Sequence, residues 1–388
     1  MNQGRVASLF LSHIETNSGY AVISLERLFY DVGLELAGGD PNLVHFGYPD
    51  FTRGFPKNLP EDFCNYILFD FKDRRNETDR QHLVSYVREK GIRLVSIFDI
   101  HPLDPIFRPL REAGAAAIVS YWGAPTSLPV PWWKGVLKKV EFARSRSKVD
   151  GLIFESKAMA ETAVRGAGVP RRMIEIVPLG AEIERFKPIA SDYVYETLGF
   201  PRDRRVVVYS GHIQPRKGVR VLVEAAIDLL VKRRRSDVCF LVCGNLGDQS
   251  KVFEQMYAGL GIDNLIRFGG YRSDLPQVFP SCFCGVIPST GWDSFTLSSA
   301  EMAAAGLPLV ASRLDGLQEA VLDGVTGLLF EPGNACQLAD YLAYLLDQPG
   351  LAAEYGRRAR QRCEAELNRG VQRARLATVY RKWLHQAK

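Results

Sequence analysis

Two short segments carry residue types that suit an anionic, sugar-containing ligand. The first is GHIQPRKG (211–218), in which glycines bracket the adjacent cations Arg216 and Lys217. A β-branched run precedes this segment and an apolar-faced helical pattern follows it (206–210 and 219–235). In parallel sheets, ligands bind where strands end and helices begin. Glycines let the backbone approach a ligand closely, and the first N–H groups of a helix attract anions.

The Arg216–Lys217 pair predicts an anionic ligand, because cations are otherwise unfavourable at a helix N-terminus. A phosphate or diphosphate fits best, since charged hydrogen bonds to phosphate are strong. The segment by itself fits a second interpretation equally well, a solvated turn whose basic side chains point outward. It is not a P-loop, because the pattern G-x-x-x-x-G-K-[ST] is absent.

The second segment, GWDSFTLSSAEMAAAG (291–306), follows a strand-like run and opens a helix of small residues. Asp293 lies in the turn and Glu301 about two turns into the helix, where carboxylates suit the hydroxyls of a polyol. Asp293 also suits a helix N-cap, whereas Glu301 lies among alanines and needs a partner once buried. The helix start offers a second cradle of backbone N–H groups, those of Ser294, Phe295, Thr296 and Leu297.

Apolar runs of strand length alternate with helical patterns along the whole chain. The predicted strands are 6–12, 65–71, 93–99, 115–122, 150–156, 174–178, 205–211, 237–244, 265–270, 284–289 and 307–313. The predicted helices include 20–36, 81–91, 219–235, 248–260, 297–305, 315–322 and 335–347. This alternation predicts an α/β protein with two doubly wound domains and parallel sheets.

The domain boundary is predicted in a stretch rich in proline, glycine and charge (178–203). We therefore expect a first Rossmann-like domain at 1–190, which would bind the acceptor, and a second at 191–370, which would bind the nucleotide sugar. Gly370 is expected to break the long charged pattern that follows. This leaves a C-terminal segment, 371–388, with a last helix of its own.

Composition excludes several classes of protein. With 46% hydrophobic and 24% charged residues, the 388-residue chain has enough apolar material for two cores and is not disordered. A net charge of +5 is small for a nucleic-acid binder but allows an anionic small molecule or a membrane surface. Seven cysteines without C-x-x-C or zinc spacing fit a reducing cytosol. Neither a signal peptide nor a transmembrane helix is expected.

The segment PSTGWDSFTLSSAEMAAAGLPLVASRLDGLQEAVLDGVTGLLFEPGN (288–334) resembles the signature of retaining glycosyltransferases of family four. That signature has two acidic residues eight positions apart, here Asp293 and Glu301. GHIQPRKG resembles the family's upstream loop, and the resemblance is specific over about 150–345. It implies a GT-B fold, in which two Rossmann-like domains face a cleft and the C-terminal helix crosses back to the first domain.

The resemblance implies a role for each candidate residue. Arg216 and Lys217 would neutralise the donor diphosphate, and Glu301 would bind the ribose of the nucleotide. Asp293 would lie at the donor sugar, near the reacting centre. The phosphates would also meet the backbone amides of Ser294, Phe295, Thr296 and Leu297, and Gly19 of the first domain.

Three positions depart from the family pattern. Asp293 stands in place of a glutamate, so its contact with the sugar must come from a closer backbone. His212 stands where arginine is frequent, which leaves Arg216 as the substitute cation beside it. Trp122 stands where a histidine usually follows a strand. Trp122 and His101 are the candidates for the acceptor side, although a lone histidine is more often structural.

These residues predict a retaining glycosyltransferase that moves a sugar from a nucleotide-diphosphate donor, preferably a UDP-sugar, to a hydroxyl of an acceptor. The acceptor would be a small molecule, a glycan or a lipid-linked compound. Cations and helix N-termini would stabilise the leaving diphosphate, so neither a metal nor another cofactor is expected. Two alternatives stay open, a nucleotide-sugar epimerase on the same fold and a non-catalytic subunit that binds nucleotide sugars.

The segment PVPWWKGVLKKVEFARSRSK (129–148) mixes tryptophan and leucine with basic residues. An interfacial helix that dips into an anionic membrane has this composition. A surface helix with Trp132 and Trp133 packed inward also fits, and Glu141, which weakens the basic face, favours this second interpretation. The expected location is therefore cytoplasmic, with at most peripheral binding at the inner face of a membrane.

Overall fold

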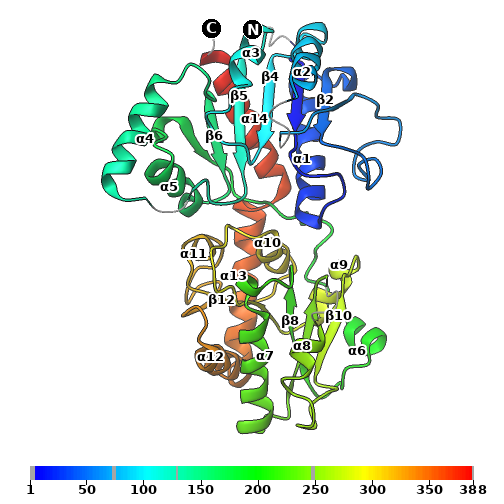
Figure 1. Cartoon of the computed structure of the whole chain (residues 1–388). Helices are drawn as coiled ribbons and strands as arrows, with labels where there is room; N and C mark the ends of the chain where they lie inside the picture. Colours follow the sequence, from blue (N-terminus) through cyan, green and yellow to red (C-terminus); the bar gives the residue numbers. More distant parts are fainter. Residues whose placement is uncertain (1–4, 72–75, 128–129, 246–249, 387–388) are drawn as a thin grey trace. The chain divides into compact units, whose positions relative to one another are not determined.

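The computed structural model describes residues 5–71, 76–127, 130–245 and 250–386. The chain forms two compact units (Figure 1). Unit 1 contains Met1–Pro178 and Gln372–Lys388, and unit 2 contains Leu179–Val371. Within the described residues, no helix combines the length and the apolar character that crossing a membrane requires.

The described part of unit 1 holds a parallel sheet of seven strands, in the order β3-β2-β1-β4-β5-β6-β7. Its strands are β1 (Ser8–Leu11), β2 (Val44–Tyr48), β3 (Tyr66–Leu68), β4 (Leu94–Phe98), β5 (Ala117–Trp122), β6 (Gly151–Phe154) and β7 (Ile174–Ile176). Its helices are α1 (Tyr20–Leu36), α2 (Glu77–Glu89), α3 (Phe107–Glu112), α4 (Trp132–Arg144) and α5 (Lys157–Gly166), together with most of α14 (Arg369–Gln386). Short 3-10 turns lie at η1 (Pro41–Leu43) and η2 (Arg171–Met173).

Aliphatic and aromatic residues divide the core of unit 1 between the two faces of the sheet. Leu9 and Leu11 of β1 belong to a mostly aliphatic cluster that includes Phe107 of α3. Phe10 points to the opposite face, because side chains alternate along a strand. There it stacks on Phe29 of α1, with ring centroids 5.3 Å apart, and meets the tilted ring of Tyr380 of α14 at 6.2 Å.

Helix α14 returns to unit 1 and completes this aromatic face (Figure 1, red). The Tyr380 hydroxyl lies 2.7 Å from the Ser96 hydroxyl of β4. The ring of Trp383 lies so close to Gly151 of β6 that a Cβ there would be 2.3 Å from it. Gly151 therefore lets the helix approach the sheet.

The helix break predicted at Gly370 lies elsewhere. Helix α13 (Pro349–Glu366) ends first, and Leu367 and Asn368 leave the helix because this backbone pairs with Ala181. The Ala181 N–H donates to the Leu367 carbonyl at 2.8 Å. The Asn368 side chain then accepts from the Val371 N–H at 2.9 Å, so Gly370 lies inside the first turn of α14.

The described part of unit 2 holds a parallel sheet of six strands, in the order β10-β9-β8-β11-β12-β13. Its strands are β8 (Arg205–Ser210), β9 (Val238–Cys243), β10 (Ile266–Gly270), β11 (Cys284–Ile287), β12 (Leu309–Ser312) and β13 (Gly327–Phe330). Its other helices are α6 (Tyr193–Leu198), α7 (Val219–Ile227, continued by a π-turn at Asp228–Lys232), α8 (Ser250–Glu254), α9 (Leu275–Val278), α10 (Leu297–Ala304), α11 (Asp315–Ala320) and α12 (Ala335–Asp347). The predicted helix at 248–260 begins partly outside the described residues.

Each sheet reverses its strand order at one point, between β1 and β4 in unit 1 and between β8 and β11 in unit 2. In sheets of this kind ligands bind beyond the carboxyl ends of the strands at such a switch point. GHIQPRKG follows β8, and the segment that begins with Pro288 follows β11. The topology therefore brings the two segments singled out from the sequence to the same edge of unit 2.

Candidate active site

The loops after β8 and β11 touch each other through glycine. Gly218 has a φ of +69°, and a Cβ on it would lie 1.7 Å from the Pro288 carbonyl oxygen. Only glycine fits this position, because it combines left-handed backbone with close packing against backbone. The Arg216 carbonyl accepts hydrogen bonds from the N–H groups of Thr290 (2.7 Å) and Gly291 (3.2 Å). These contacts fix the spacing of the two loops.

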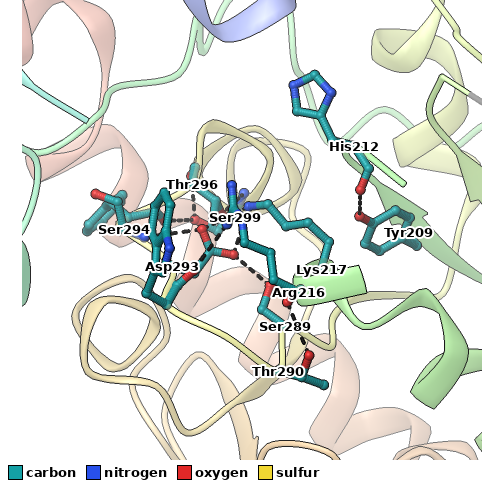
Figure 2. A network of polar contacts seen from close by, with 12 residues as sticks. Tyr209, His212, Arg216, Lys217, Ser289, Thr290, Asp293, Ser294, Thr296 and Ser299 are labelled. Carbon is teal, nitrogen blue, oxygen red and sulfur yellow. Dashed lines mark hydrogen bonds and ion pairs between the residues drawn. The ribbon is translucent and has the colours of Figure 1, made fainter. Parts of the chain in front are cut away.

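An ion pair joins the same loops (Figure 2). Lys217 Nζ donates to both carboxylate oxygens of Asp293, each at 2.8 Å. The carboxylate also accepts from the Ser289 hydroxyl at 2.6 Å and from the Ser294 N–H at 3.1 Å. The Asp293 side chain is only 4% exposed, so these bonds compensate the loss of its hydration.

Arg216 lies on the solvent side of this pair. Its guanidinium lies over the indole ring of Trp292, 4.0 Å from the ring centroid, and donates to the Trp292 carbonyl at 3.1 Å. Trp292 itself is exposed. Trp292 was not predicted as a site residue, although its place directly before Asp293 in a strand-to-helix turn was a usable signal.

His212 stays outside the Lys217–Asp293 network. Its backbone carbonyl accepts from the Tyr209 hydroxyl at 2.8 Å, while its ring points away from the ion pair in Figure 2. The ring is partly exposed, but desolvation by the surrounding protein, followed by the charges of Lys217 and Arg216, lowers the pKa of His212. The imidazole is therefore neutral at physiological pH and contributes no cation to the site.

The start of α10 has the geometry of an anion-binding helix N-terminus. Thr296 is the N-cap, with a φ of +58°, and its hydroxyl accepts from the Ser299 N–H at 3.3 Å. Phe295 is buried and Leu297 opens the helix. The first N–H groups of any helix lack partners within it, so this turn suits a phosphate. Of the predicted cradle, the Ser294 N–H already binds Asp293.

Glu301 lies one turn into α10 and is 3% exposed, in keeping with its alanine-rich surroundings. The turn before the helix is held from behind by α11, where a Cβ on Gly316 would lie 2.2 Å from the Asp293 carbonyl oxygen. Helix α11 thus supports the backbone of the site.

The candidate residues of unit 1 have local partners. Gly19 is the N-cap of α1, and its carbonyl accepts from the Ile23 N–H at 3.0 Å. The His101 ring accepts from the Leu103 N–H at 3.3 Å, and Trp122 is buried with its ring stacked on Phe154. Trp122 is thus part of the core at the carboxyl end of β5.

Two acids, Asp99 and Glu155, lie at the carboxyl edge of the first sheet. Asp99, which follows β4 with a φ of +51°, accepts from the Gly123 N–H at 3.0 Å. Burial raises the pKa of Asp99 to about 7. Glu155, directly after β6, is 5% exposed, and its carboxylate lies 3.3 Å from where a Cβ on Gly123 would be. Glu155 was not predicted, although an acidic residue directly after a strand could have indicated it.

A second unpredicted acid, Glu26 of α1, lies in a cavity of unit 1. Its buried carboxylate lies beside the buried Tyr48 hydroxyl. Burial raises the pKa of Glu26 to about 7. The cavity has room for about one water molecule. Its lining is mostly apolar and includes Phe10, Phe29, Phe46, Tyr48 and Phe98.

The sequence predicts a site without a metal, and metal ions in proteins are bound mainly by carboxylate, histidine and cysteine side chains. The described residues contain no group of three or more such side chains arranged to hold a metal ion.

Comparisons with known proteins agree with this geometry. Residues 195–362 match the family model described as glycosyl transferases group 1. The D-inositol 3-phosphate glycosyltransferase of Corynebacterium urealyticum is 32% identical over 218 residues, which are 53% of this chain and 51% of that protein. The enzyme of the same name from Corynebacterium efficiens is 35% identical over 45% of this chain and 43% of its own length. The chain thus spans about half the length of the curated relatives it matches.

Solved structures resemble the whole chain. A glycosyltransferase from Rickettsia africae has a TM-score of 0.81 at 16% identity, over 98% of this chain and 99% of that one. HepE of Anabaena in complex with UDP has a TM-score of 0.78 at 19% identity, over 97% and 100%. The predicted GT-B fold is confirmed, because the chain has the fold of these glycosyltransferases, and its residues 195–362 match the glycosyl transferases of group 1.

Proposed function

We propose that the protein is a retaining glycosyltransferase that moves a sugar from a nucleotide-diphosphate donor, preferably a UDP-sugar, to an acceptor hydroxyl. One observation carries the proposal. At the switch point of unit 2, Arg216, Lys217 and the N-termini of α7 and α10 gather beside the buried carboxylate of Asp293. The group 1 family match over this unit and the UDP and UDP-glucose complexes of HepE support it.

The proposed chemistry follows from the charges. The bond between the sugar and the diphosphate breaks with growing negative charge on the leaving group, which preorganised cations and helix N–H groups stabilise. Arg216 and Lys217 act on this charge, and Asp293 holds Lys217 in place before the donor arrives. A phosphate oxygen of the leaving group takes the proton of the acceptor hydroxyl, so the step needs no metal and no other cofactor.

The two buried acids of unit 2 have different proposed roles. Glu301 binds the ribose hydroxyls of the nucleotide, and Asp293 lies beside the donor sugar. Asp293 is one methylene shorter than glutamate, so its carboxylate lies close to the loop backbone. The ion pair with Lys217 holds the carboxylate there. Gly19 and, on the acceptor side, His101 complete the proposal in unit 1, whereas the buried Trp122 supports the end of β5 from the core.

We also propose a cytoplasmic location with peripheral binding to a membrane. All seven cysteines are free thiols, which supports a reducing compartment. The membrane part rests on α4 and is developed in the next subsection.

Ligand-induced thermal stabilisation with UDP, GDP and ADP tests the donor site. A nucleotide present at 100 times its Kd should add about 2.7 kcal/mol of stability. We expect UDP to raise the Tm of the wild type, and Lys217→Ala and Arg216→Ala to lose the shift. Lys232→Ala removes an exposed lysine of α7's continuation and serves as the control. If the two site variants keep a full shift, or if no nucleotide shifts the wild type, the proposed diphosphate site is wrong.

Transfer assays complete the test. With UDP-sugars and a panel of hydroxyl acceptors, activity should persist in excess EDTA and the product should keep the anomeric configuration of the donor. Loss of activity in EDTA that Mg²⁺ restores would contradict the metal-free reaction.

A further inference from the structure

Helix α4 exposes an unusual amount of apolar surface. Its large apolar side chains are exposed by 83% (Trp132), 48% (Trp133), 50% (Val136), 60% (Leu137) and 42% (Val140). Single exposed apolar residues are common, but a contiguous exposed patch usually marks an interaction site. We call these five side chains the α4 face. The inward packing of the two tryptophans that the sequence favoured is therefore wrong.

The reason is the way α4 attaches to unit 1. Its fully buried residue is Phe142, and a Cβ on Gly168, which has a φ of +73°, would lie 2.5 Å from the backbone of Lys138. A Cβ on Gly135 would lie 3.5 Å from the Arg165 carbonyl oxygen. Residues of a helix are about 100° apart around its axis, so these three contacts lie on one side.

The same geometry turns the apolar residues outward. Trp133 and Val140 lie nearly opposite Phe142 around the helix, with Val136 and Leu137 on either side of them. Backbone contacts at glycines therefore hold the helix, and its most apolar stripe faces solvent. Figure 1 shows α4 beside α5 at the edge of unit 1, beyond β6.

Positive charge surrounds this stripe. Lys134 and Lys139 border it on its two sides, and the Lys134 ammonium lies 5.2 Å from the ring centroid of Trp133. Lys138 pairs with Glu141 at 3.2 Å. Residues 132–148 contain six lysines or arginines and one glutamate, so this segment alone has a net charge equal to the +5 of the whole chain. The rest of the chain is neutral on balance.

We propose that the α4 face docks on a membrane surface that contains anionic lipids. Tryptophan and aliphatic side chains bury themselves at the boundary between headgroups and acyl chains, while flanking lysines bind lipid phosphates. Helix α4 has 13 residues, about 20 Å, which is too short to span a bilayer, so it lies parallel to the membrane.

Docking through this helix gives the proposed reaction a location. An enzyme held at the headgroup level meets acceptors that are embedded in the same membrane, so the acceptor is a lipid-linked hydroxyl compound. This assignment of the acceptor rests on the proposed function, whereas the docking itself does not.

Vesicle co-sedimentation tests the docking. Full-length wild type is mixed with vesicles of phosphatidylcholine alone or of phosphatidylcholine with phosphatidylglycerol. We expect binding to the anionic vesicles, weakening with salt, and at least tenfold weaker binding for Trp132→Ser/Leu137→Ser. Lys134→Ser/Lys139→Ser should weaken binding by roughly tenfold or more, since each cation near the surface contributes separately. Ile189→Ser/Val252→Ser, which removes exposed apolar residues of unit 2, should bind as the wild type does.

Three outcomes would overturn the proposal. The wild type would stay in the supernatant with anionic vesicles, or Trp132→Ser/Leu137→Ser would bind as well as the wild type. Alternatively, sedimentation velocity would show a dimer that this variant dissolves, with no vesicle binding, which would make the face a contact between two copies. The UDP thermal shift is measured on each variant. A variant that loses vesicles but keeps the shift separates the docking surface from the donor site.

Discussion

The two sheets have the same kind of switch point, and the acids of the two units differ in their electrostatics. In unit 2, Lys217 and Asp293 form a complete ion pair beneath Arg216. In unit 1, burial raises the pKa values of Asp99 and Glu26 to about 7, so much of this acid is protonated at neutral pH. The edge of unit 2 is thus charged before any ligand arrives, which suits a diphosphate. In unit 1 these two acids hold their protons up to neutral pH, which suits contact with a hydroxyl group rather than with an anion.

The largest effect should come from breaking the ion pair of unit 2. Asp293→Asn leaves Lys217 without its buried partner, and we expect the free energy of unfolding to fall by about 3–5 kcal/mol. The double variant Lys217→Met/Asp293→Leu should recover much of this stability, because it removes both charges. Denaturant unfolding measures all of these variants. If Asp293→Asn is as stable as the wild type, the pair is not the element that fixes the loops.

For the acids of unit 1, we expect that removing a charge raises the free energy of unfolding instead of lowering it. The pKa of Glu26 is about 7 in the folded protein, whereas 4.5 is the ordinary value that applies to the unfolded chain. The folded protein therefore holds the proton more tightly. This contribution to stability is complete below pH 4.5 and is lost as pH rises toward 7. Glu26→Gln should therefore stabilise the protein at pH 8 by up to about 3 kcal/mol, and should flatten the pH dependence.

Stability measured from pH 4.5 to 8 checks this second prediction. Asp99 changes stability in the same direction, so Glu26→Gln should remove only part of the slope. Glu77→Gln, at an exposed residue in the first turn of α2, is the control and should leave the slope unchanged. Equal slopes for Glu26→Gln and the wild type would show that Glu26 is ionised in the fold.

The contact between the two loops of unit 2 can be tested separately from their charges. Gly218→Ala introduces a Cβ against the Pro288 carbonyl and should lower the free energy of unfolding by about 2–3 kcal/mol. The variant should also lose the Tm increase that UDP produces. Gly324 has the same φ of +69° with nothing within 4 Å of its Cβ position, so Gly324→Ala isolates the cost of left-handed backbone. Similar losses for the two variants would mean that the close approach is unimportant.

The smallest effect concerns the exposed part of the site. Trp292→Ala removes the ring beneath Arg216, a contact worth about 0.5–1 kcal/mol at an exposed position. We expect UDP to bind a few-fold more weakly with little change in protein stability. Calorimetric titration measures this, and Trp292→Phe should restore most of the affinity. Unchanged affinity in Trp292→Ala would show that Arg216 needs no support from the ring.

The sequence predicted the parts of the fold that depend on continuous apolar runs. The strands on both sides of the two segments were found, and so were α1 and α12 at their observed bounds. Strand β2 was missed because His45 and Gly47 interrupt it. His45 is buried with its ring 2.8 Å from the Tyr86 hydroxyl, and Gly47 makes room for Leu11. Such tertiary partners are invisible in a local pattern.

The candidate site shows the same limit. Residue types predicted that Lys217 and Asp293 lie near one ligand, but not that they bind each other, because this depends on the reversal of strand order between β8 and β11. Composition also singled out the segment that forms α4, without giving the direction of its apolar side chains. Close backbone contact at Gly135 and Gly168 decides which side packs, and glycine carries no hydrophobic signal.

The return of α14 has a consequence for biosynthesis. Tyr380 and Trp383 complete the aromatic face of unit 1, yet all of unit 2 lies between them and the last strand of that sheet. At ordinary elongation rates the ribosome needs roughly 10 to 40 s to make the intervening residues. During this interval the aromatic surface of unit 1 is exposed to solvent. Unit 2, whose strands are contiguous in the chain, can finish folding first, so the nascent chain depends on chaperones most at the end that emerged earliest.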